Sequence, residues 1–144
     1  MKKPKVIFLC THNAARSQIA EAFLRNIAGN HFEVYSAGFE PNEIHPLTYK
    51  VMEELGYELK DHTAKALDTY LGKVHFGIVI TVCTNAEKLC PVLPGVSTRE
   101  YWPFDDPSSF EGTEEEKLEK FREVRDQIKE KILDFLKRRN IQSE

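Results

Sequence analysis

Two short, uninterrupted apolar runs, each followed at once by a cysteine, constrain the fold of this chain more than any other feature. Residues 6–9 (Val-Ile-Phe-Leu) lead into Cys10, and residues 77–82 (Gly-Ile-Val-Ile-Thr-Val) lead into Cys83. Apolar runs of this length are typical of strands that are buried on both faces, as in a parallel sheet. We therefore predict that both cysteines stand at the carboxyl ends of buried strands.

Patterns with helical spacing separate these predicted strands. The first starts at Ser17 and ends at Gly29. The second starts at Pro46 and ends at Gly56, because proline favours the first turn of a helix and glycine favours its end. Residues 32–36 lie between them and alternate in the manner of a strand. The residues expected to face inward are Ala20, Phe23, Leu24 and Ile27 in the first helix and Leu47, Val51 and Leu55 in the second.

The second half of the chain continues this alternation. Thr63 is suited to cap a short helix, residues 98–102 predict one more strand, and residues 105–109 form a turn-prone stretch. Thr113 and Glu116 have the spacing of a capping box, which predicts that a long helix begins there. The expected inward-facing residues are Leu67 and Leu71 in the short helix and Leu118, Phe121, Val124, Ile128, Ile132 and Phe135 in the long one.

Strands that alternate with helices predict an α/β fold. We expect a single domain over residues 1–140, built on an open, mainly parallel four-stranded sheet with helices on both faces, and a frayed tail at 141–144. In such sheets ligands bind beyond the carboxyl ends of the strands. Cys10 and Cys83 are both predicted to lie there.

Composition narrows the class of function. The chain has 144 residues, a net charge of -3 and mixed positive and negative side chains, which argues against a nucleic-acid surface. No apolar run approaches the roughly 20 residues of a membrane span, and the start of the chain lacks the apolar core of a signal peptide. We expect a cytoplasmic monomer, in which the three cysteines serve as thiols and not as a disulfide framework.

The segment between the first strand and the first helix has the properties of an oxyanion-binding loop. Backbone N–H groups at a helix start point toward a common centre that favours an anion. Arg16 can clamp two oxygens with its planar fork, and the positive surroundings favour the thiolate form of Cys10. Ser17 can donate a hydrogen bond to the sulfur, and Asn13 suits a left-handed backbone. The expected oxyanion-binding residues are Thr11, His12, Asn13, Ala14, Ala15, Arg16 and Ser17.

Simpler readings of the same residues stay open at this point. Cys10 can be a buried core thiol with Arg16 a surface charge, and Asp106 can belong to an ordinary turn. His12 lies two residues from Cys10, as a metal ligand would, but no second ligand pair has zinc-like spacing. We therefore predict neither a metal nor a cofactor.

Three motifs carry a resemblance over nearly the whole chain. They are residues 10–22, the run Tyr-Ser-Ala-Gly at 35–38, and the pair Asp106 and Pro107. Together they resemble the low-molecular-weight protein tyrosine phosphatase family. The resemblance implies that the thiolate of Cys10 attacks an oxyanion, that the loop and Arg16 hold its charge, and that Asp106 protonates the leaving oxygen.

Cys83 and Cys90 separate two possible activities within that family. A phosphatase needs only Cys10, whereas reduction of arsenate requires two electrons, which a set of thiols can supply as a disulfide. The pair at this place and spacing resembles that of the thioredoxin-coupled arsenate reductases. This implies a relay in which a Cys10 adduct is followed by a Cys10–Cys83 and then a Cys83–Cys90 disulfide, with thioredoxin as the reductant. If residues 83–90 are helical, that segment must unwind, because two turns separate the thiols by roughly 10 Å.

Other readings of the pair remain. Cys83 and Cys90 can simply fill the core, in which case the chain is a phosphatase of phosphate monoesters, and weak phosphatase activity can also accompany reduction. A third alternative is a non-catalytic module that only binds an anion. Tyrosines typically follow the Asp-Pro pair in the tyrosine phosphatases, whereas this chain has Ser108 and Ser109, which favours the reductase.

One departure concerns potassium. Some reductases of this family bind the ion near the loop, and the matching residues here are Asn13, Glu21, Ser36 and Thr63, but Lys65 stands where an acidic member is expected. An ammonium group can substitute for the charge of the ion. From this departure we predict that the enzyme does not need potassium.

Overall fold

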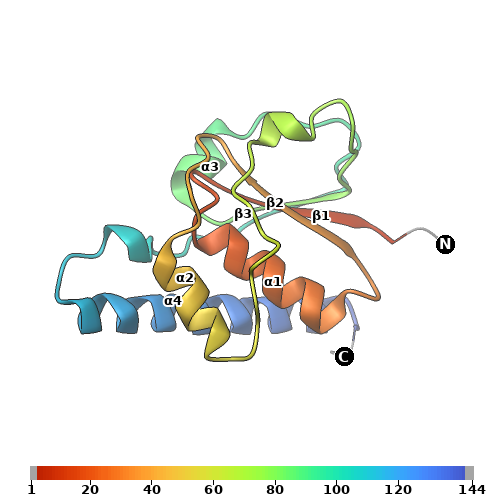
Figure 1. Ribbon diagram of the computed structural model, residues 1–144. Helices are drawn as coiled ribbons and strands as arrows, with labels where there is room; N and C mark the ends of the chain where they lie inside the picture. The colour runs from red at the N-terminus through yellow and green to blue at the C-terminus, as the bar shows by residue number, and fades with distance from the viewer. Residues whose placement is uncertain (1–2, 142–144) are drawn as a thin grey trace.

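A four-stranded, entirely parallel sheet organises residues 3–141, which are the residues described by this computed structural model (Figure 1). The strand order is β2-β1-β3-β4. The strands are β1 (Lys5–Cys10), β2 (Glu33–Gly38), β3 (Ile78–Thr81) and β4 (Thr98–Tyr101). One hydrophobic core cluster packs around them, which confirms the predicted α/β single-domain fold.

The register of the central strand, β1, brings the two predicted catalytic cysteines, Cys10 and Cys83, to one edge of the sheet. Cys10 pairs with Gly38 of β2, and Leu9 pairs with Thr81 of β3. Cys83 follows two residues after the end of β3. Because the strands are parallel, the ends of β1, β2 and β3 meet there, as expected for a ligand-binding edge.

Helices cover both faces of the sheet. In Figure 1, α1 (Arg16–Ala28), α2 (Pro46–Glu53) and α4 (Glu114–Arg138) lie on one side, while α3 (Thr84–Leu89) lies on the other. A short 3-10 helix, Leu67–Thr69, also lies on the side of α3, and a second one spans Pro107–Ser109. Helix α4 begins with the predicted capping box between Thr113 and Glu116. Its buried residues include Phe121, Val124, Ile128, Ile132 and Phe135.

The core is centred on the first strand and the long last helix. Val6, Ile7, Phe8 and Leu9 are fully buried, as the continuous apolar run predicts. Trp102, just after β4, packs its ring against Phe8 and against Phe135 of α4. Within residues 3–141, no helix is both long and apolar enough to cross a membrane.

The predicted short helix after Thr63 is wrong. Only the 3-10 turn at Leu67–Thr69 forms, and its N-cap residue is Ala66 and not Thr63. The polar groups of residues 63–65 are committed elsewhere: the Thr63 carbonyl accepts a hydrogen bond from Gln18, and the Lys65 N–H donates to Asn13. Tertiary contacts with the loop therefore override the local helix signal.

Two inward-facing predictions are also wrong. Leu55 and Leu71 are exposed, at 39% and 40% of their surface. Helix α2 ends at Glu53, so Leu55 falls in the following turn, where Gly56 has a left-handed backbone (φ +86°). The predicted frayed tail starts at Ile141, but the Ile141 N–H donates to the Leu136 carbonyl and its side chain packs on the core. The rest of that tail, 142–144, lies outside the described residues.

Candidate active site

The loop after β1 wraps around the sulfur of Cys10. Asn13 has a left-handed backbone (φ +54°), as predicted, and its N–H donates to Cys10 Sγ at 3.1 Å. Ser17 Oγ lies 2.9 Å from the same sulfur and accepts a hydrogen bond from Asn13 Nδ2 at 2.7 Å. Because the hydroxyl accepts from Asn13, its own proton is free to point at Cys10. Two donors therefore converge on the sulfur and stabilise its anionic form.

Helix α1 begins inside this loop. Its first residue is Arg16, and the preceding Ala15 carries no side chain that could accept hydrogen bonds from the first turn. The N–H groups of that turn are consequently available to an anion, and the helix dipole adds partial positive charge. This is the arrangement expected for an oxyanion cradle.

A small pocket opens over the sulfur and brings together three of the predicted catalytic residues, Cys10, Arg16 and Asp106. Arg16 donates to the Phe104 carbonyl at 3.1 Å and lies 3.7 Å from the Asp106 carboxylate. Asp106 also accepts hydrogen bonds from the Ser108 N–H and hydroxyl, at 3.0 and 2.6 Å. The carboxyl group is thus held at the rim by the turn that follows it. The remaining lining residues are His12, Ala14, Ala15 and Ser108.

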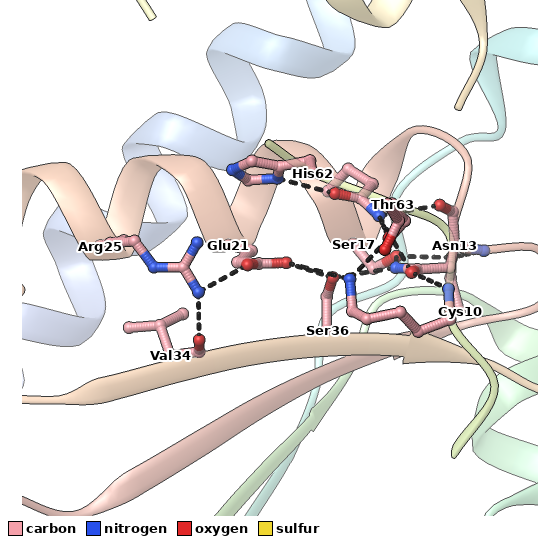
Figure 2. Close-up of polar contacts among 11 residues, drawn as sticks. Cys10, Asn13, Ser17, Glu21, Arg25, Val34, Ser36, His62 and Thr63 are labelled. Atoms are coloured by element: carbon pink, nitrogen blue, oxygen red, sulfur yellow. Dashed lines mark hydrogen bonds and ion pairs between the residues drawn. The ribbon is translucent and has the colours of Figure 1, made fainter. Parts of the chain in front are cut away.

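A chain of buried polar contacts supports the loop from behind (Figure 2). Asn13 Nδ2 donates to Ser36 Oγ on β2 at 2.9 Å, and that hydroxyl donates to the buried carboxylate of Glu21. Arg25 pairs with Glu21 at 2.6 Å. The chain runs from the thiol to an ion pair on α1, so the position of Cys10 depends on residues well outside the loop.

Sequence reasoning missed two members of this support, Gln18 and His62. The Gln18 amide nitrogen contacts both oxygens of Asn13, at 3.2 and 2.9 Å, and the Thr63 carbonyl at 2.9 Å. His62 Nδ1 lies 2.9 Å from Gln18 Oε1, which can only accept, so Nδ1 carries the proton. Burial lowers the pKa of His62, which favours the neutral imidazole ring with its single proton on Nδ1. The sequence pattern contains no signal for Gln18, because at helical spacing it falls opposite the apolar face of the first helix.

The residues that match the potassium group do not fit a cation here. Asn13 Oδ1 accepts from Gln18 and from the Lys65 N–H, both at 2.9 Å. The Lys65 ammonium donates to the Thr63 carbonyl at 2.6 Å and lies 4.0 Å from Glu21. Burial lowers the pKa of Lys65, and Glu21 opposes that effect. Among the described residues, no three His, Cys, Asp or Glu side chains are grouped to hold a metal ion.

Gly38 ends β2 directly against the loop, and the close approach explains the glycine. A Cβ atom there would stand 2.7 Å from the Thr11 carbonyl oxygen and 2.9 Å from the Asn13 nitrogen. Both neighbours are backbone atoms of the oxyanion loop, so the loop itself would have to shift.

We predict that Gly38→Ala lowers turnover about 100-fold, because a displacement near 1 Å at a reacting group costs that much. The unfolding free energy should fall by about 1–3 kcal/mol from the same overpacking. Steady-state kinetics and chemical denaturation measure the two effects. Gly72→Ala is the control, since the space at that glycine is open and any loss comes only from its left-handed backbone. Unchanged turnover in Gly38→Ala would contradict the close packing of the loop.

The other two cysteines flank α3. Cys83 is buried, precedes the helix, and its sulfur accepts from the Ala86 N–H at 3.3 Å. Cys90 follows the helix and is half-buried beside an apolar cavity that also includes Val92 and Arg99. Burial raises the pKa of Cys90, while Arg99 opposes the shift. All three cysteines are free thiols, and the helix between Cys83 and Cys90 is intact.

Comparison with known proteins assigns the family. Residues 5–144 match the model of the low molecular weight phosphotyrosine protein phosphatases. The chain belongs to this family. Its relatives include the "Arsenate reductase" of Bacillus licheniformis, 42% identical over 94% of this chain and 96% of that protein. The protein of the same name from Halalkalibacterium halodurans is 40% identical over 94% and 96%.

Solved structures with the same fold agree with this assignment. An arsenate reductase in the phosphate-binding state superposes with a TM-score of 0.79 at 30% identity, over 94% of this chain and 98% of that one. A thioredoxin-dependent arsenate reductase of Corynebacterium glutamicum has a TM-score of 0.70 at 32% identity, over 94% of this chain and 61% of that one. The Erwinia amylovora tyrosine phosphatase AmsI, at 17% identity and a TM-score of 0.75, shares the fold.

Proposed function

We propose that this enzyme reduces arsenate to arsenite through Cys10, Cys83 and Cys90, and that thioredoxin restores the thiols. The observation that carries the proposal is the presence of three free thiols, one in the oxyanion loop and two flanking a short helix at the adjacent strand end. The names of the relatives and the thioredoxin dependence of the C. glutamicum protein support it.

In the first step the loop, residues 11–17, holds arsenate by its N–H groups while Arg16 binds two of the oxygens. The Cys10 thiolate attacks arsenic, a sulfur–arsenic bond forms, and one arsenic–oxygen bond breaks. Asp106, at the rim of the pocket, gives its proton so that the oxygen leaves as water. Arsenic is still in its oxidised state at this stage.

The second step transfers the electrons. The Cys83 thiolate attacks Cys10 Sγ, a disulfide forms, and the sulfur–arsenic bond breaks with its electron pair passing to arsenic. The two sulfurs lose two electrons, arsenic gains them, and arsenite leaves after taking up a proton. Cys83 lies close to Cys10 because their strands, β1 and β3, are paired. The hydroxyl of Thr11, the residue after Cys10, is 3.6 Å from the Cys83 sulfur.

The third step moves the disulfide to the surface. Cys90 attacks Cys83, the new Cys83–Cys90 bond forms, and Cys10 leaves as a thiolate. Because α3 keeps its ends about 10 Å apart along the axis, beyond the reach of a disulfide, the helix must unwind. The half-buried Cys90 then becomes accessible to the two thiols of thioredoxin, which reduce the bond.

Hydrolysis of phosphate monoesters is the second candidate, and the pocket formed by Cys10, Arg16 and Asp106 favours it as a side activity. The test is NADPH consumption with thioredoxin, thioredoxin reductase and arsenate, run beside hydrolysis of an aryl phosphate. The proposal expects arsenate-dependent consumption of NADPH that exceeds the hydrolysis rate. Hydrolysis without NADPH consumption would instead identify a phosphatase. Absence of both activities would favour the third alternative, a module that only binds an anion.

Potassium should not activate the enzyme, because the Lys65 ammonium already contacts the Thr63 carbonyl. We expect turnover to stay within about twofold when sodium is replaced by potassium at constant ionic strength, which steady-state rates will measure. Lys65→Asp is the informative comparison, since it restores an acidic group at this position. A large rise in wild-type turnover with potassium would contradict the assignment.

A further inference from the structure

The side chain of Asn85, on α3, forms a hydrogen bond that the relay above does not use. Asn85 Nδ2 donates to Thr11 Oγ1 at 3.0 Å, across 74 positions of sequence. The same oxygen lies 3.6 Å from the sulfur of Cys83. A single hydroxyl thus connects the oxyanion loop, α3 and the second thiol.

The chemistry of the two groups fixes which of them donates this hydrogen bond. An amide nitrogen only donates, so the Thr11 hydroxyl accepts from Asn85 and keeps its one proton for another partner. The Cys83 sulfur is within reach of that proton and already accepts from the Ala86 N–H at 3.3 Å. When Cys83 is a thiolate it cannot donate, and the hydroxyl becomes its second donor.

We propose that Asn85 is a positioning residue that orients the Thr11 hydroxyl toward Cys83 and so stabilises the attacking thiolate. Cys83 is buried and must ionise before it can attack Cys10, and hydrogen bonds to an anionic sulfur favour that form. The role rests on the proposed function, in which Cys83 is the second nucleophile. The hydrogen-bond chain itself can be tested without arsenate.

The hydrogen bond from Asn85 should last only as long as α3 stays folded. Asn85 lies inside the helix that must unwind for the third step. Unwinding withdraws the amide, so the Thr11 hydroxyl is freed once Cys83 has formed its bond with Cys10. The Asn85 amide therefore orients the hydroxyl while Cys83 is a nucleophile and no longer does so when Cys83 is attacked by Cys90.

The test measures the ionisation of Cys83 in the full chain carrying Cys10→Ser and Cys90→Ser, by the ultraviolet absorbance of the thiolate as pH is varied. Asn85→Asp reverses the hydrogen bond, since a carboxylate only accepts and takes the Thr11 proton. Thr11→Val removes the hydroxyl. Each should lower the thiolate fraction at a given pH about tenfold, while Thr11→Ser should restore it.

Lys88→Gln is the matched control for charge, because it changes the net charge by the same amount as Asn85→Asp from an exposed position on α3. Its titration curve should coincide with the parent. If Asn85→Asp and Thr11→Val also coincide with the parent, the assignment is overturned. Coincidence of Asn85→Asp alone also overturns the role of Asn85, because Thr11→Val tests only the hydroxyl. Asn85→Ala takes the place of Asn85→Asp if circular dichroism shows a folding defect. If the titration shifts as expected but the wild-type protein fails to reduce arsenate, the proposed function is refuted and the hydrogen-bond role still stands.

Discussion

Cys83→Ser should reduce arsenate turnover about a thousandfold or more while hydrolysis of an aryl phosphate stays within about threefold, because only reduction needs a second thiol. In this variant Cys10 can still bind arsenic, but a serine hydroxyl cannot form a disulfide and no electrons leave the protein. Hydrolysis uses the pocket of Cys10, Arg16 and Asp106, whose lining does not include Cys83. NADPH consumption and aryl phosphate hydrolysis measure the two activities side by side.

Cys90→Ser is the matched control, since it removes a thiol at the other end of the same helix. It should release one arsenite per chain and then stop, because the Cys10–Cys83 bond can form but cannot be passed on. Mass spectrometry should find that disulfide in Cys90→Ser and none in Cys83→Ser. Repeated turnover by Cys90→Ser would remove Cys90 from the relay, and equal loss of both activities in Cys83→Ser would count against the relay as a whole.

The strand ends could be predicted because their signal is local. The run before Cys10 is apolar at every position, and each of those residues is fully buried in β1. Strand β3 is similar: its four residues are all buried, the first three are apolar, and its end precedes Cys83 by two positions. Parallel strands buried on both faces need no alternation, so the pattern identified them and placed both cysteines at one edge.

The support of the site could not be predicted in the same way, because it is built from contacts between distant segments. Gln18 has its Thr63 partner 45 positions away, and Asn85 has its Thr11 partner 74 positions away. Their amide side chains are ordinary residues in a helical pattern. The failed helix at Thr63 has the same origin, since its local capping preference competed with hydrogen bonds to the loop.

The largest effect common to both activities is expected at Arg16. Its guanidinium uses separate nitrogens for the Phe104 carbonyl and for the Asp106 carboxylate, which holds the planar fork at the rim of the pocket. Arg16→Lys keeps the positive charge but loses the fork and its anchor. We expect kcat/KM to fall about 100- to 1,000-fold for arsenate and for an aryl phosphate alike, as for loss of an oxyanion-hole donor.

Comparing the two substrates distinguishes a role of Arg16 in the oxyanion cradle from a role in the electron-transfer steps. Arg138→Lys, at an exposed arginine that pairs with the half-buried Glu100, is the control and should change neither rate. A loss confined to arsenate would assign Arg16 to the electron-transfer steps instead of the oxyanion cradle. Because reduction and hydrolysis share their first bond-forming step at Cys10, a residue that stabilises that step must affect both, whereas Cys83 acts after the two reactions have diverged.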